Sequence, residues 1–172
     1  MTFTGDWAKA RRILRVGKDG RLKNAIKIAL RQEAEWFRRE VVVGIRNQAP
    51  GGKQFKPLKP ATIAAKGSSK ALIDSNTLRR SITRKTFDGG DKQFVGVLRT
   101  AREKNGSAVA DIAAIHEYGA PKANIPARPF LQPVEDATGK DSPKRMLARV
   151  AILLGGDLGR LLFNGISLKS SK

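Results

Sequence analysis

The sequence contains no cysteine and a single histidine, and both facts limit the kinds of catalytic and metal site that the chain can form. Without cysteine there is no disulfide framework, no thiolate zinc site and no cysteine nucleophile. A single histidine excludes a metal site built from several histidines. The chain is therefore compatible with the reducing cytoplasm, and we expect neither a metal nor any other cofactor.

Long apolar runs are missing as well. The longest candidate, residues 146–154, is interrupted by Arg149 and is shorter than the roughly 18 residues that a membrane span needs. The N-terminus lacks the basic-then-apolar pattern of a signal peptide. Aromatic residues form only 6% of the chain. We therefore expect no membrane partner, a modest aliphatic core, and some stabilisation from neighbouring subunits.

Acidic residues are few beside the basic ones. The chain has 34 Lys and Arg against 15 Asp and Glu, a formal net charge of +19. Such an excess is typical of proteins that work beside polyanions. The alternative is a solvated basic face that only keeps subunits soluble, because basic charge alone identifies no partner.

Motifs for catalysis are also missing. No phosphate-binding glycine loop is present, and the acidic residues are mostly scattered rather than convergent as metal-dependent phosphoryl transfer requires. His116 and Glu117 are adjacent and resemble a general base beside a carboxylate. We expect this segment to be extended, so that the two side chains point to opposite faces. The sequence therefore predicts no enzymatic activity, and an interface or packing role for His116.

Apolar residues recur at steps of three or four between residues 22 and 46, which predicts one long amphipathic helix. Its stripe consists of Leu22, Ile26, Leu30, Ala34, Phe37, Val41 and Ile45. The preceding residues 1–21 are basic and broken by glycines, which is typical of an arm. Within the proline- and glycine-rich connection that follows, Pro60–Lys66 is a candidate short helix.

Three later segments have strand character: residues 78–87, 93–100 and 108–115. Turn-forming residues separate them at 88–91 and 103–106, which predicts an antiparallel meander. Residues 119–133 contain four prolines, which favours an extended strap. A last helix is expected from about residue 143 to 153 and onward to 163, followed by a flexible tail, 164–172.

These elements predict an α+β fold in one domain, residues 22–163. A long N-terminal helix packs on a small antiparallel sheet, an extended proline-rich strap follows the sheet, and a helix ends the domain.

Two stretches resemble the virion morphogenesis family of tailed phages, which includes tail-completion or neck proteins of Mu-like and long-tailed phages. The first joins Phe55–Thr62 to Leu72–Ile82, where the family has an aromatic residue before Pro-Leu and then Leu-x-Asp-Thr-Gly-x-Leu-x-x-Ser-Ile. This chain has Ser75-Asn76 in place of Thr-Gly. Asparagine tolerates a left-handed backbone better than other non-glycine residues, so the turn is expected to survive.

The second stretch joins Ala114–Gly119 to Ile125–Leu131 and resembles the family signature of His-Glu-aromatic-Gly followed by Pro-Ala-Arg-Pro-Phe-Leu. Together the motifs span residues 55–131. The resemblance implies a structural virion protein, assembled in the bacterial host cytoplasm, that forms a homo-oligomeric ring at the neck during tail completion and head-tail joining. A hexamer is favoured, and a twelve-fold ring is the alternative.

The resemblance also implies partners. These are a head-tail connector or stopper protein, a tail terminator or tail tube protein, and genomic DNA bound without sequence specificity in the lumen. A different hypothesis is a free nucleic-acid-binding protein that acts through its basic surface. A nuclease is disfavoured by the missing carboxylate and histidine clusters.

The signature motif supplies the candidate interface residues, which are His116, Glu117, Tyr118, Arg128, Pro129, Phe130 and Leu131. A strap stiffened by proline presents Arg128 and Phe130 to a partner with little loss of entropy, so Phe130 is expected to fill a partner's apolar pocket. The alternative is that Phe130 fills its own subunit's core and Arg128 caps a sheet edge.

The basic arm and first helix supply a second candidate surface, which is expected to face DNA or an acidic partner. Its residues are Arg11, Arg12, Arg15, Lys23, Lys27, Arg31, Arg38 and Arg39.

Overall fold

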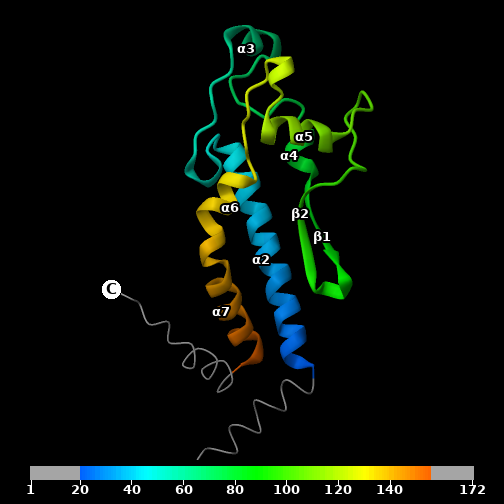
Figure 1. Ribbon diagram of the computed structural model, residues 1–172, viewed down its shortest axis with the longest axis vertical. Coiled ribbons are helices and arrows are strands. Elements are labelled where there is room, and N and C mark those ends of the chain that lie inside the picture. Colours follow the sequence, from blue (N-terminus) through cyan, green and yellow to red (C-terminus); the bar gives the residue numbers. More distant parts are fainter. Residues whose placement is uncertain (1–19, 156–172) are drawn as a thin grey trace, which may run out of the picture.

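The computed structural model describes residues 20–155, and one long helix organises them. Helix α2, Arg21–Arg46, lies between a β-hairpin and the last described helix, α7, Ser142–Leu154 (Figure 1). The hairpin joins β1, Ile82–Phe87, to β2, Lys92–Val97. The predicted α+β fold, with a long first helix, a small antiparallel sheet and a C-terminal helix, is confirmed.

Helix α2 buries two different apolar stretches. Toward its C-terminal end, Val41 and Ile45 are fully buried, as the predicted stripe requires. Toward its N-terminal end, Ala25 and Ala29 pack against Val150 of α7. Ile26 of the predicted stripe is instead exposed. Small alanines allow two helix backbones to approach closely, so they occupy the α2–α7 contact in place of the bulkier isoleucine.

A buried ion cluster also joins α2 to α7. The carboxylate of Glu33, only 7% exposed, accepts hydrogen bonds from Arg145 Nε at 3.0 Å and from Arg149 Nη1. The Arg145 guanidinium also stacks on the Trp36 ring, 4.0 Å from its centroid. Burial by itself raises the pKa of Glu33, but the hydrogen bonds from the two arginines outweigh it and lower the pKa. Glu33 is therefore ionised at neutral pH.

Among residues 20–155 the sheet has two strands, not three. Ile82 pairs with Val97 and Phe87 with Lys92, and 3-10 helix η2, Asp88–Gly90, closes the hairpin. The third predicted strand is wrong, because Val109–Tyr118 forms helix α5. Its β-branched residues suggested a strand, but three alanines favour a helix, and a helix buries Val109 and Ala113 on one face.

The first predicted strand also starts later than expected. Residues Thr77–Ser81 form a short helix, α4, before β1 begins at Ile82. Asn76 immediately before it has a φ of 64°, so the left-handed turn expected at this position is confirmed. Helix α3, Pro60–Lys66, forms as predicted.

The proline-rich strap follows α5 and is largely irregular, with 3-10 helix η3, Pro121–Ala123, inside it. It ends earlier than predicted, because helix α6, Gln132–Thr138, places Pro133 in its first turn, where proline is tolerated. Helix α6 and the 3-10 helix η4, Gly139–Asp141, were not predicted.

Another 3-10 helix, η1, Pro50–Gly52, follows α2 and packs against α6. A Cβ atom on Gly51 would lie 2.0 Å from the carbonyl oxygen of Pro133, so this contact requires glycine.

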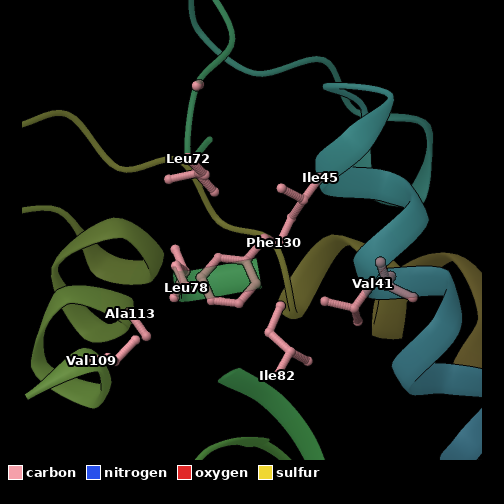
Figure 2. Packing of buried hydrophobic residues seen from close by; sticks show 10 residues of the cluster. Val41, Ile45, Leu72, Leu78, Ile82, Val109, Ala113 and Phe130 are labelled. Atoms are coloured by element: carbon pink, nitrogen blue, oxygen red, sulfur yellow. The ribbon is translucent and has the colours of Figure 1, made fainter. Parts of the chain in front are cut away.

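The main core lies where α2, α4, β1, α5 and the strap meet. Figure 2 shows the Phe130 ring at its centre, with Leu78 on one side, Val41 and Ile45 of α2 on the other, and Ile82 below it. Phe130 has no exposed surface and is the largest fully buried side chain of the described residues. The strap thus supplies the central residue of a core that is otherwise aliphatic.

Several predictions concern residues outside the described range. They are the basic arm before residue 20, with Arg11, Arg12 and Arg15, the continuation of the last helix toward residue 163, and the tail 164–172. Within residues 20–155, no helix is both long enough and apolar enough to cross a membrane.

The Glu33 cluster predicts a specific loss of stability in acid. Because the folded-state pKa of Glu33 lies below 4.5, its contribution is present above about pH 4.5 and is lost as the pH falls through the folded-state value. Glu33→Gln should lower the unfolding free energy by about 1–3 kcal/mol at neutral pH, and this difference from the wild type should shrink in acid. Urea unfolding between about pH 3 and 7 measures it. The control Asp74→Asn, at an exposed carboxylate in the loop before α4, should show no such narrowing.

Candidate functional site

Glu117, near the C-terminal end of α5, holds the strap by its backbone. Its Oε2 accepts hydrogen bonds from the N–H groups of Phe130 at 2.9 Å and Leu131 at 3.1 Å, and its Oε1 accepts one from Gln132 at 2.9 Å. These donors precede and begin α6, where no earlier turn supplies a backbone acceptor. Glu117 therefore caps α6 from another helix, and a negative charge is favourable at that end.

The same end of α5 makes two further contacts with the strap. The carbonyl oxygen of His116 accepts a hydrogen bond from the Arg128 N–H at 2.7 Å. Gly119, with a φ of 81°, ends the helix, and a Cβ atom there would lie only 3.0 Å from the backbone nitrogen of Ala127. Glycine at this position thus allows the strap to pass directly against the helix end.

Arg128 ties the strap to the segment before α3. Its Nε donates to the carbonyl oxygen of Lys56 at 3.1 Å, and its Nη2 donates to that of Pro57 at 3.2 Å. The residue is 7% exposed. The planar guanidinium donates hydrogen bonds to both carbonyl oxygens at once, which the ammonium group of a lysine does less well.

The two motif stretches therefore meet in one place. We call this place the strap lock and define it as Glu117, Gly119, Arg128 and Phe130 with the carbonyls that they contact. Its geometry corrects one expectation, because Phe130 fills the core of its own chain rather than a partner's pocket. The alternative stated for Phe130 is the one observed. Arg128 meets the backbone of the segment before α3, not a sheet edge.

A sequence model of the phage virion morphogenesis family matches residues 11–146. The chain belongs to this family. The match contains the whole strap lock, helix α2 and the hairpin, and it ends within α7.

A short stretch is also similar to an uncharacterized protein of Methanocaldococcus jannaschii. The two are 56% identical over 32 residues, which is 19% of this chain and 24% of that protein. The chain thus spans about a quarter of that relative's length. No solved structure matches the chain.

In this member of the virion morphogenesis family, a cavity of about 870 Å³ lies beside the strap lock. The segment 56–66, the loop before α4, helix α5 and strap residues 123–128 line it. His116 faces it, and its Nδ1 is buried and has no hydrogen-bond partner among the described residues. The pKa of His116 is lowered by burial and by the nearby charges of Arg128 and Lys66, so the imidazole is neutral at pH 7.

His116 and Glu117 do not converge, as predicted, although the reason differs. They lie on a helix rather than a strand, where neighbouring side chains are about 100° apart. His116 lines the cavity, while Glu117 binds the strap. Within residues 20–155 no group of three or more His, Asp or Glu residues is placed to hold a metal ion.

Tyr118 is the exception among the predicted interface residues. Its side chain is 81% exposed, although it stands between the strap-binding Glu117 and Gly119. Ile115, one turn earlier on α5, is also exposed. Whether these residues contact a partner stays a prediction, but Tyr118 is available for it and Phe130 is not.

The predicted basic residues of α2 divide into two sets. Lys27 and Arg38 are engaged within the chain: Lys27 Nζ donates to the Gly89 carbonyl at 2.8 Å, and Arg38 forms a two-pronged ion pair with Glu35. Lys23, Arg31 and Arg39 are exposed. Only the second set has its full charge available to another molecule.

Glu117 is expected to be essential for stability. Glu117→Ala removes the acceptor of three backbone N–H groups and should lower the unfolding free energy by about 1–3 kcal/mol in urea. Glu117→Gln keeps one carbonyl oxygen and should lose less. Asp74→Ala, at an exposed carboxylate in the loop before α4, is the control and should change the value by about 0.5 kcal/mol or less. Equal effects of Glu117→Ala and Asp74→Ala would contradict the capping role.

Alanine substitutions of Phe130 and Tyr118 should have different effects on the stability of the chain. Phe130→Ala leaves a cavity at the centre of the core and should cost about 3–5 kcal/mol of unfolding free energy. Tyr118→Ala removes an exposed ring of similar size and should change it by about 0.5 kcal/mol or less. Urea unfolding of both variants measures the contrast. A stable Phe130→Ala monomer would show that the ring is not a core residue.

Proposed function

We propose that the chain is a structural virion protein that forms a ring at the neck of a tailed phage, where it completes the tail and joins it to the head. Membership of the virion morphogenesis family over residues 11–146 carries this proposal. The family points to assembly of the virion rather than to catalysis. The ring, a hexamer in the favoured form and twelve-fold in the alternative, would let the genome pass through its lumen.

Exposed apolar residues support assembly with other subunits. The outward face of the hairpin carries Phe87 and Phe94, both exposed, beside Lys85 and Lys92. No other described element covers this face (Figure 1). The other face of the hairpin packs on α2, so a neighbouring subunit that buries Phe87 and Phe94 would cover the face that this chain leaves bare and add to the stability of the sheet.

Tyr118 supplies a second contact. An aromatic side chain that is exposed on a rigid segment loses little entropy on binding, and tyrosine is enriched among residues that dominate interface energies. The strap lock fixes the end of α5 that carries it. The connector or stopper on one side and the tail terminator or tube on the other are the partners that such a ring would meet.

A free nucleic-acid-binding protein remains the competing hypothesis, favoured by the net charge of +19. Detection of the chain in purified virions separates the two, because a free binding protein would be absent from them. A symmetric reconstruction of the neck gives the order of the ring.

Tyr118→Ala should leave the chain folded yet block joining, so that filled heads and free tails accumulate. Electron microscopy of lysates counts them, and circular dichroism checks the fold. Lys122→Ala, an exposed residue of η3, is the control and should complete virions normally. If Tyr118→Ala also completes virions normally, Tyr118 is not part of the joining interface.

A further inference from the structure

A cleft of about 500 Å³ lies over α2 and is lined by Arg31, Gln32, Glu35 and Arg39 of that helix, Arg84 of β1 and Arg149 of α7. We call it the arginine cleft. Two of its arginines, Arg84 and Arg149, come from elements far from α2 in sequence. Folding therefore gathers four guanidinium groups that no motif in the sequence brings together.

The two arginines from outside α2 are held in place. Arg84 Nη1 donates to Thr86 Oγ1 at 2.9 Å and to Gln93 Oε1 at 2.8 Å. Arg149 is bound to Glu33, which it shares with Arg145. One carboxylate against two guanidinium groups leaves that cluster positive. These side chains need no reordering to receive an anion.

Arg31 and Arg39 differ from the other two arginines of the cleft, because they are exposed and form no hydrogen bond or ion pair within the described residues. They are eight residues apart on α2, which separates them by about 12 Å along the helix axis. Glu35 lies midway, and hydrogen bonds from Arg38, together with the charges of Arg39 and Arg84, lower its pKa. An ionised carboxylate at the midpoint disfavours a single anion there and leaves two flanking positions for anions.

We propose that the arginine cleft binds the phosphodiester backbone of nucleic acid, without sequence specificity. This rests on the proposed function in so far as the nucleic acid is the genome in the lumen. One strand of a duplex places a phosphate about every 3.4 Å along the axis, so the spacing of Arg31 and Arg39 spans about three to four phosphates. The cleft thus fits an extended polyanion.

The composition of the cleft favours nucleic acid over an acidic protein. Within the described part of the chain, its lining consists of arginine, glutamine and glutamate and includes no apolar residue. Protein interfaces usually have an apolar centre, whereas contacts to phosphates are polar, charged and wet. The aromatic residues of the hairpin lie on its opposite face, away from Arg84.

Glu35 is expected to weaken the binding of phosphates to the arginine cleft. It pairs with Arg84 at 3.8 Å and attracts the charge of Arg39, so it competes with phosphate for these two guanidinium groups and repels phosphate itself. A lining that must hold a moving duplex without trapping it needs many weak contacts with no preferred register. Removal of the carboxylate charge should therefore strengthen binding rather than weaken it.

The test measures binding of the full chain to a short fluorescein-labelled DNA duplex of mixed sequence, by fluorescence anisotropy between about 50 and 200 mM salt. Arg31→Ala and Arg39→Ala should each lower affinity by up to about fivefold and make the slope of log K against log salt shallower by about 0.9. Glu35→Gln should raise affinity. Arg80→Ala, an exposed arginine on α4, is the matched control and should leave the slope unchanged.

Every outcome of these measurements either supports or overturns the inference. If Arg31→Ala and Arg39→Ala lose no more affinity than Arg80→Ala, the cleft does not bind nucleic acid. If they bind DNA normally but fail to complete virions, the cleft meets an acidic protein instead and the inference is overturned. If the chain is absent from virions while its DNA binding still depends on the cleft, the inference stands and the proposed place at the neck fails.

Discussion

The capture of the strap by Glu117 is the contact on which the other features of the site depend. A single carboxylate binds three successive backbone N–H groups, and this fixes the chain direction immediately before α6. Phe130 is one of the residues so fixed, and its ring fills the centre of the core. The same contact thus sets the start of a helix and the position of the largest buried side chain.

The residues of the family signature therefore act mainly by stabilising the fold of this chain. Glu117, Gly119, Arg128 and Phe130 are all used within the chain, each through a contact that another residue type would weaken. Tyr118 alone is turned outward. This division separates residues that build the family fold from one that is free to meet a partner, although they are neighbours in sequence.

Much of the fold could be predicted from periodicity and turn chemistry. The long helix, the hairpin turn and the left-handed Asn76 each follow from local rules, and the structure bears them out. Helix α5 was not predicted, because Val109 and Ile112 suggested a strand. Its three alanines favour a helix, and the packing of Val109 and Ala113 on one helix face adds to that preference. Strand preference is a weak guide for a short segment, because it depends on which neighbours the side chains pack against.

The site was predicted less completely than the fold. The signature showed which residues matter, but not that Glu117 binds backbone groups or that Arg128 reaches the carbonyls of Lys56 and Pro57. The Glu117 contacts join residues 13 to 15 positions apart, and those of Arg128 join residues 71 and 72 positions apart, so neither set leaves a local pattern in the sequence. Arg84 and Arg149 were missed for the same reason.

The exposed hairpin is prone to pair with strands of other chains, and its lysines reduce this tendency. The edges of this two-stranded ribbon pair with no third strand among residues 20–155, and such edges are a template on which other chains can add strands. Lys85 lies over the Phe87 ring, 5.4 Å from its centroid, and Lys92 pairs with Asp88 at the turn. Positive charges set among the aromatic residues repel a like hairpin that approaches in parallel register. The ribbon is thereby protected from indiscriminate self-addition, while a surface of different charge and shape can still cover it.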